Sequence, residues 1–339
     1  MKRFLLKLSY TVLPLWLLTM TVTGFYKLKV EPEMNGELGP LGKLVFPVEH
    51  KDNVDITTKY YTDCVSLEEL TDTVVDVLTL GDSFSQQWLG SYENFIARDG
   101  FSTVNLHVAM NMFQTAYDLM KLGYVDSTHV KTIIIESCER FTVERILKLS
   151  TLDTAVTVMP INTVRAVGED DTSRNNPLIE TRNWILLRLG IKHPVRHARV
   201  NRELFSGGDG RDLYFLDEDL YQTSISPAET VIIKRNIGLI NNMADSLGIK
   251  IVYLVPPDKY TVYQQYITNN PFPLKTVGKQ LKTMMASDNV HVWVFGIDVV
   301  SQSVETGEKD VYPVSATHWN WSTSERVAST ISALITRTR

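Results

Sequence analysis

The segment TLGDSFSQQW, Thr79 to Trp88, places a serine hydroxyl where acyl chemistry is feasible. It follows an apolar run of strand length and precedes a stretch compatible with a helix. A serine at that junction lies at the carboxyl edge of a sheet, where open α/β sheets place their sites. Gly81 permits a tight turn, so Ser83 is the candidate nucleophile and its own backbone N–H a candidate oxyanion donor. Asp82 and Ser83 are also ordinary helix-start residues, and a simple helix cap is the alternative interpretation.

A serine nucleophile needs a base, because its hydroxyl stays protonated at neutral pH. His318 is the candidate, within YPVSATHWNW, Tyr312 to Trp321. This polar loop lies between the last predicted strand and the last predicted helix, at the sheet edge where Ser83 is expected. The other histidines fall in predicted strands, in a basic run or in other loops. A single histidine is more often structural, and the pairing with Ser83 is what favours the catalytic interpretation.

The elements that must position these two residues follow from alternating patterns along the chain. Strand-length apolar runs occupy Val74–Leu80, Ser102–Val108, Lys131–Ser137, 250–257 and 290–297. Helical patterns occupy Ser85–Ala97, 112–123, 139–149, the capped amphipathic stretch Ser226–Ile249, Gln280–Ala286 and Ser322–Thr336. This alternation predicts an α/β fold, a three-layer α/β/α sandwich with a mainly parallel sheet.

The predicted organisation has three parts. Residues 1–29 form a membrane anchor or signal peptide, residues 30–70 a linker rich in proline and glycine, and residues 71–339 the catalytic domain. An insertion at about 150–225 interrupts the domain as a partly helical subdomain, with one predicted helix at Leu178–Leu189. The insertion carries a basic run: Arg182, Arg188, Lys192, His193, Arg196, His197, Arg199 and Arg202. This run suits an anionic polymer, and a solvated helix face is the ordinary alternative.

The N-terminal segment differs from the rest in composition. Leu8 to Phe25 is apolar or weakly polar and follows Lys2, Arg3 and Lys7. That is about the minimum length for a membrane-spanning helix, and the residues before Phe25 match a signal-peptidase site poorly. The charge distribution predicts a cytoplasmic N-terminus and a catalytic domain in the periplasm, anchored in the inner membrane. Secretion after signal cleavage is the alternative.

Composition bounds the remaining classes of function. The chain has 339 residues, 44% apolar and 22% charged, with a net charge of −5. The acidic balance argues against a nucleic-acid partner. No pair of His or Cys residues has metal-ligand spacing and no strand is followed by a glycine-rich phosphate loop, so neither metal nor cofactor is predicted. Cys64 and Cys138 are either a disulfide or two buried thiols.

Two further stretches carry charged residues near the expected site. Glu136, Glu139 and Arg140, in ESCER, suit a buried ion-pair cluster behind the site better than catalysis. Lys259, after two prolines and Asp258, either reaches an anionic substrate or supports its loop.

Taken together, these residues resemble the SGNH, or GDSL, esterases and acyltransferases, which have an early Gly-Asp-Ser and a late His. The stretches IIIESCERF, LVPPDKYTVYQQYI and ATHWNW are similar to the alginate O-acetyltransferase branch, whose members acetylate polysaccharides in the periplasm. The resemblance covers most of Val74 to Thr336 except the insertion. It implies a Ser–His mechanism and an acetyl donor delivered by a membrane-bound O-acyltransferase partner. It also implies a side-chain oxyanion donor, for which Asn111 is the candidate; a helix N-cap is the alternative for that residue.

The chain departs from this family at two points. The histidine block comes last here, as in ordinary SGNH enzymes, whereas in the alginate enzymes it precedes the serine block. The aspartate of the family's D-T-H-W corresponds to Ala316, and the ordinary SGNH spacing falls on Ser315. An aspartate that orients the imidazole contributes orders of magnitude in rate, although some activity survives its loss.

Three interpretations of His318 therefore stay open. It forms a Ser–His dyad oriented by a backbone carbonyl; it borrows a carboxylate from Asp310 or Asp298; or the enzyme is inactive. The expected function is an extracytoplasmic polysaccharide O-acetyltransferase acting through an acetyl-Ser83 intermediate. An acetylesterase with the same chemistry, and an inactive glycan-binding or assembly subunit, are the alternatives.

Overall fold

The computed structural model describes residues 10, 12–18, 38, 56–64, 67, 70, 74–107, 111–126, 129–152, 186, 194–286 and 291–336. Within these ranges one sheet of six parallel strands has the order β1-β3-β2-β4-β7-β8. The strands are β1 (Thr62–Cys64), β2 (Val75–Gly81), β3 (Thr103–His107), β4 (Val130–Glu136), β7 (Lys250–Val255) and β8 (Val292–Phe295). The predicted α/β fold with a parallel sheet is confirmed.

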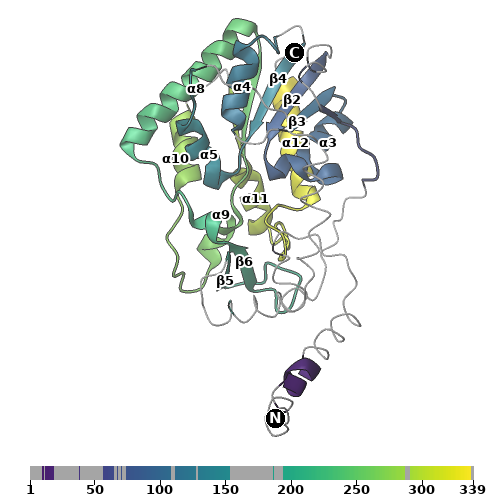
Figure 1. The fold of residues 1–339 in the computed structure, drawn as a ribbon, viewed down its shortest axis with the longest axis vertical. Helices are drawn as coiled ribbons and strands as arrows, with labels where there is room; N and C mark the ends of the chain where they lie inside the picture. Colours follow the sequence, from purple (N-terminus) through teal and green to yellow (C-terminus); the bar gives the residue numbers. More distant parts are fainter. Residues whose placement is uncertain are drawn as a thin grey trace, which may run out of the picture.

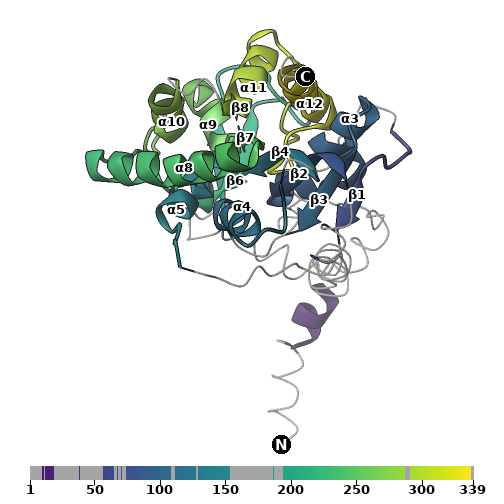
Figure 2. The same ribbon diagram turned by 90° about the horizontal axis from the view of Figure 1, so that it is seen from above.

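Helices cover both faces of this sheet (Figures 1 and 2). One face carries α4 (Met112–Lys121), α5 (Glu139–Leu147), α8 (Pro227–Leu247) and α10 (Val277–Met285). The other carries α3 (Tyr92–Arg98), α11 (Gly296–Glu305) and α12 (Trp321–Thr336). In β4, Ile133 and Ile135 belong to one hydrophobic cluster and Ile134 to the other. Because side chains alternate along a strand, a sheet buried on both faces reads as a continuous apolar run.

The strand order defines the position of the site. The chain passes from β2 to β3 on one side, and then from β4 to β7 on the other. The carboxyl ends of β2 and β4 therefore form the topological switch point, where open α/β sheets have their crevice. Gly81 ends β2 and Glu136 ends β4, so the predicted nucleophile segment begins at this point.

Helix α8 shows why the sequence pattern was informative. Ser226 and Glu229 form a capping box, Pro227 occupies the first turn, and Gly248 ends the helix with φ 68°. Each is a local signal of a helix terminus, readable without tertiary contacts.

The segment after Ser83 differs from the single helix predicted at Ser85–Ala97. It forms two short 3₁₀ helices, η2 (Ser83–Gln86) and η3 (Trp88–Gly90), and then α3. Trp88 has φ 52°, a left-handed conformation that interrupts a helix and is strained for an aromatic residue. A Cβ at Gly90 would overlap the indole of Trp321, so the close approach of α12 requires glycine there.

The sheet also extends into the predicted linker. Strand β1 pairs in parallel with β3, with Asp63 opposite Asn105. The described residues of the N-terminal segment contain no helix long and apolar enough to cross a membrane, and most of residues 1–29 lie outside the described ranges. Cys64 and Cys138 are both buried without a disulfide between them, in clusters on opposite faces of the sheet.

The described part of the insertion forms an antiparallel hairpin, β5 (Val195–Arg199) and β6 (Asp212–Leu216), followed by η5 (Asp217–Leu220). It packs on α9 (Lys259–Tyr263) through Phe215 against Tyr260 and Phe205 against Tyr263. The helix predicted at Leu178–Leu189 lies outside the described residues except Leu186, which is helical. The hairpin therefore shares the hydrophobic cluster of the main domain.

Candidate active site

The turn after β2 carries the predicted nucleophile. Ser83 begins η2 and is partly exposed, whereas Phe84 and Ser85 are buried. A Cβ at Gly81 would overlap the Glu136 carboxyl and lie 2.6 Å from Ser85 Oγ. Glycine is therefore required for the close approach of this turn to β4.

Asp82 fastens the turn to β4 and α5. Its Oδ2 accepts hydrogen bonds from Cys138 N at 3.0 Å and from Arg145 Nη1 at 2.7 Å. Its own backbone N–H donates to Glu136 Oε2 at 2.7 Å. The Asp82 carboxylate thus binds donors at the start and in the body of α5.

The two carboxyl groups at this turn differ in charge. Burial alone would raise the pKa of Asp82, but the Glu136 carboxyl and the Arg145 charge hold it well below its ordinary value. Burial, together with the neighbouring charge of Asp82, raises the pKa of Glu136 well above its ordinary value. At neutral pH Asp82 is therefore negatively charged and faces Arg145, while its neighbour Glu136 is shifted toward the protonated form.

Buried polar side chains connect the turn to β2 and β3 through hydrogen bonds. Thr79 Oγ1 donates to Asn105 Oδ1 at 2.9 Å, and Asn105 Nδ2 donates to the Ser85 carbonyl at 3.3 Å. Ser85 Oγ donates to the Asp82 carbonyl at 2.8 Å. The backbone around Ser83 is therefore fixed by hydrogen bonds from β2 and β3.

The predicted base lies against this turn. The His318 ring meets the Phe84 ring edge to face at 4.6 Å between centroids, and Trp319 meets the same ring at 4.7 Å. Since Ser83 directly precedes Phe84, the segments of the two predicted catalytic residues are in contact. His318, like Ser83, is partly exposed. The contact joins residues more than two hundred positions apart in the chain.

Lys259 holds the backbone of the His318 loop, which we define as residues 310–320. The ammonium donates to the carbonyls of Pro313 at 2.6 Å, Val314 at 3.0 Å and Ala316 at 2.9 Å. Its side chain is 1% exposed. All three N–H groups are engaged in these contacts, so Lys259 supports the His318 loop rather than the turn that carries it.

The helix that carries Lys259 is anchored by α5. Glu139 Oε2 accepts from Thr261 Oγ1 at 2.5 Å and from Asp258 N at 3.2 Å. Arg140 Nη1 donates to Asp258 Oδ1 at 2.7 Å, and Lys275 pairs with the same carboxylate. Glu139 and Arg140 therefore lie in the buried ion-pair cluster predicted for them, whereas Glu136 contacts the Ser83 turn instead.

Both acids considered as substitutes for the absent aspartate have hydrogen-bond or ion-pair partners of their own. Both carboxylate oxygens of Asp310 accept from Ser206 N at 3.1 Å, which holds the chain between β5 and β6. Asp298, in α11, is 53% exposed and pairs with Lys282 at 2.6 Å. Ala316 is partly exposed and its carbonyl is bound to Lys259. Asp310 therefore ties the His318 loop to the segment between β5 and β6, and Asp298 belongs to an exposed ion pair.

Asn111 is the N-cap of α4. Its Oδ1 accepts from Phe113 N at 3.1 Å and Gln114 N at 3.3 Å, and its Nδ2 donates to the Arg145 carbonyl at 2.7 Å. These contacts favour the helix-cap alternative over the oxyanion donor.

The basic run of the insertion is largely neutralised where the structure describes it. Arg196 pairs with Asp217, and His197 contacts Asp212 at 2.8 Å. Arg199 pairs with both Asp209 and Asp212. Arg196, His197 and Arg199 thus contact carboxylates along the hairpin, whereas Arg202 donates to the Val304 carbonyl.

Arg145 is the main residue of the site that sequence reasoning missed. It lies on α5 one turn after Phe141, and its guanidinium stands 5.2 Å from the Phe141 ring. The four-residue spacing of an arginine and an aromatic residue was a usable signal. Its partner Asp82 lies 63 positions away and could not be inferred locally.

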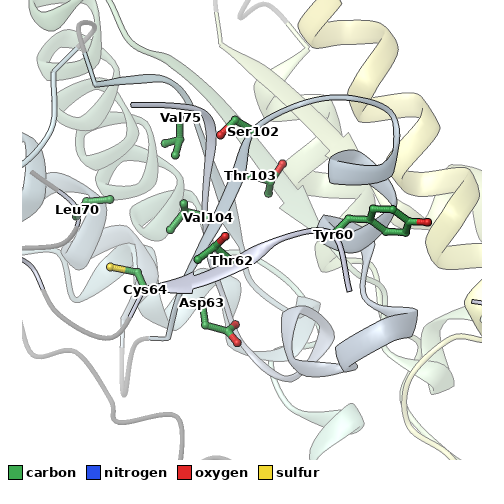
Figure 3. A pocket seen from close by; sticks show the side chains of 9 residues that line it. All are labelled: Tyr60, Thr62, Asp63, Cys64, Leu70, Val75, Ser102, Thr103 and Val104. Carbon is green, nitrogen blue, oxygen red and sulfur yellow. The ribbon is translucent and has the colours of Figure 1, made fainter. Parts of the chain in front are cut away.

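Two cavities lie away from Ser83 and His318. One, of about 160 Å³, is lined by the side chains in Figure 3, among them Val75 and Thr103 at the amino ends of β2 and β3. The other, of about 240 Å³, lies at the tip of the β5–β6 hairpin near Lys309. Within the described ranges, no group of three or more His, Cys, Asp or Glu residues is placed to hold a metal ion.

Comparison with known proteins adds no family assignment, since neither a family model nor a curated protein matches this sequence.

Proposed function

We propose that the protein is a serine-dependent acyltransferase of the SGNH type that acetylates an extracytoplasmic glycan. The observation that carries this proposal is the contact between Phe84 and His318, at 4.6 Å, which joins the Gly-Asp-Ser turn to the late histidine. The position of Ser83 beyond β2, at the switch point of the sheet, supports it further.

The proposed reaction proceeds in two steps. Ser83 Oγ attacks the acetyl carbonyl of the donor, and His318 takes the serine proton and returns it to the leaving group. A sugar hydroxyl then attacks the acetyl-serine ester; His318 accepts its proton and restores it to Ser83 as the acetyl group leaves. The N–H of Ser83 stabilises the oxyanion in both steps. With water as acceptor the same steps are those of an acetylesterase.

The substrate class and cellular location rest on the resemblance of the sequence to polysaccharide O-acetyltransferases. We infer an inner-membrane anchor at residues 1–29, a periplasmic catalytic domain, and a membrane-bound O-acyltransferase as the source of acetyl groups. The order β3-β2-β4-β7-β8 within the sheet is compatible with an SGNH fold.

Covalent labelling tests the enzymatic part of the proposal. A fluorophosphonate probe should label the full-length protein at Ser83, and a chromogenic acetyl ester should be hydrolysed. The Ser83→Ala variant should lose both signals. Ser91→Ala, which changes a buried serine after η3, should still be labelled at Ser83. Absence of labelling and turnover in the unmodified protein would refute the enzyme assignment.

An inactive glycan-binding or assembly subunit is the second candidate function, and Ala316 favours it. The residue two positions before His318 carries no carboxylate, and its carbonyl is bound to Lys259. Under this hypothesis the unmodified protein binds polysaccharide but neither labels nor turns over.

The acceptor is tested in cells. Replacement of the chromosomal copy by Ser83→Ala should remove O-acetyl groups from a surface polysaccharide, measured by proton NMR of the purified polymer. Unchanged acetylation, in cells that produce the variant at normal level, would exclude a transferase function on that polymer.

A further inference from the structure

Lys259 is a buried cation whose entire donor capacity serves one loop. Its ammonium binds the carbonyls of Pro313, Val314 and Ala316. The residue is only 1% exposed, so the ammonium is shielded from solvent. The last of these carbonyls is two residues before His318. Three carbonyls that converge on one ammonium fix the path of the backbone up to the histidine.

Stability alone does not account for this lysine. Burial of an ammonium is costly, and replacement of buried ionic groups by well-packed apolar side chains is often neutral or stabilising. The compensation here is partial: Asp219 and Asp310 supply negative charge, and the Phe205 ring lies 5.7 Å from the ammonium. The lysine donates hydrogen bonds that hold the three carbonyls together, and an apolar side chain could not do so.

The backbone next to Lys259 is held by hydrogen bonds from other segments. Asp258, its neighbour, is held through its backbone N–H by Glu139 and through its carboxylate by Arg140 and Lys275. The three stretches that carry the sequence resemblance are therefore connected in space. The support runs from the end of β4, through the start of α9, to the His318 loop.

We propose that Lys259 is a positioning residue for His318, which sets the place and orientation of the imidazole relative to Ser83 by gathering the loop carbonyls. The proposal rests on the catalytic role of His318 in the proposed function. Under this proposal Lys259 holds the histidine in a chain that has Ala316 where the SGNH family it resembles has the orienting aspartate.

The kinetic test is Lys259→Met, which keeps the length of the side chain and removes the donors. We expect kcat for a chromogenic acetyl ester, and the fluorophosphonate labelling rate of Ser83, to fall about 100-fold, as expected for a displaced catalytic group, with KM little changed. Lys234→Met, at an exposed position of α8, should leave both unchanged. A change in KM alone, or rates equal to the unmodified protein, would overturn the proposal.

Tyr312→Phe distinguishes positioning from general loosening of the loop. Tyr312 Oη donates to the Pro257 carbonyl at 2.5 Å, so it links the same two segments without binding the carbonyls beside His318. At a comparable loss of stability in urea, the rate should fall much less than in Lys259→Met. Equal rate losses in the two variants would overturn a specific positioning role.

The imidazole signals of His318, assigned by comparison with His318→Gln in ¹⁵N NMR, give a readout independent of activity. In Lys259→Met these signals should shift, whereas those of His129 should not. The groups that face Lys259 are Asp219 from η5 and Asp310 from the loop, and neither is altered. If the unmodified protein is not labelled but the His318 signals still shift, the enzyme assignment fails and the positioning inference stands; unchanged signals overturn the inference.

Lys259→Gln serves if the methionine variant does not fold. An amide retains two N–H donors, and it should recover part of the labelling rate relative to Lys259→Ala. Equal rates in Lys259→Gln and Lys259→Ala, with both proteins folded by circular dichroism, would overturn the proposal.

Discussion

The Ser83 turn and the His318 loop are held by opposite electrostatic means. At the turn an anion, Asp82, gathers a backbone N–H and a guanidinium. At the loop a cation, Lys259, gathers three carbonyl oxygens. One segment of the site is organised through its hydrogen-bond donors and the other through its acceptors.

The difference has consequences for pH. The Asp82 pKa is depressed, so its charge persists through the neutral range. Burial lowers the pKa of Lys259 to about 7, against the nearby charges of Asp219 and Asp310. The turn should therefore keep its electrostatic support over a wide pH range, whereas the support of the loop changes within the neutral range.

Removal of the anion should have the largest effect on stability. Asp82→Ala leaves the partly buried Arg145 guanidinium without its carboxylate, and we expect a loss of about 3 kcal/mol in unfolding free energy, measured by urea denaturation at pH 7. Asp298→Ala, which breaks an exposed pair with Lys282, should change stability by less than about 0.5 kcal/mol. Similar losses in the two variants would contradict the contrast between buried and exposed pairs.

Lys259→Met should change how stability depends on pH. The unfolded lysine titrates near 10.4, about three units above the folded value, so between these values the unfolded state binds more protons and stability rises with pH. The rise has an upper limit of about 1.4 kcal/mol per pH unit. The unfolding free energy of the unmodified protein relative to that of Lys259→Met, from urea curves between pH 7 and 10, should rise with pH; parallel profiles would exclude Lys259 as the source.

Ala316→Asp introduces a carboxylate into the His318 loop, two residues before the histidine. If the site is a weakened enzyme, the new carboxylate should raise the rate of acetyl-ester hydrolysis about tenfold or more, because an orienting acid contributes strongly to serine–histidine catalysis. Ala316→Asn is the isosteric control without charge. No gain in either variant would indicate that another group already orients His318, or that chemistry is absent.

Glu136→Gln should have the smallest effect. Burial, with the charge of Asp82, raises the pKa of Glu136. The contribution of this carboxyl to stability is therefore complete below the unfolded pKa and is lost as pH rises. Glutamine resembles the protonated acid and still accepts from Asp82 N, so stability at pH 6 should change by less than about 0.5 kcal/mol. Glu136→Ala should cost more, because it removes that acceptor. A large loss with glutamine would indicate an ionised Glu136.

The sequence predicted those parts of the fold that depend on local periodicity and on strand order. The runs around β2, β4 and β7, and the caps of α8, are local signals, and the parallel order then places Ser83 at the carboxyl edge. The pairing of Ser83 with His318 was likewise inferred from their positions relative to the strands, and the contact of His318 with Phe84 agrees with it.

The remaining features depend on partners distant in the chain. The interruption of the predicted helix at Trp88 accompanies the approach of Trp321 to Gly90, which no local pattern encodes. Strand β1 has three residues, too few for a periodicity. The role of Lys259 depends on carbonyls more than fifty residues away, and backbone acceptors leave no trace in side-chain composition.

The close packing of Trp321 against Gly90 joins the segment that follows Ser83 to the segment that follows His318. Trp321 opens the helix that follows the His318 loop, and Gly90 ends the short helices that follow Ser83. A methyl group at position 90 would overlap Trp321 Nε1 and would force the two segments apart. The relative position of the Ser83 turn and the His318 loop thus depends on the absence of an atom as well as on the groups that are present.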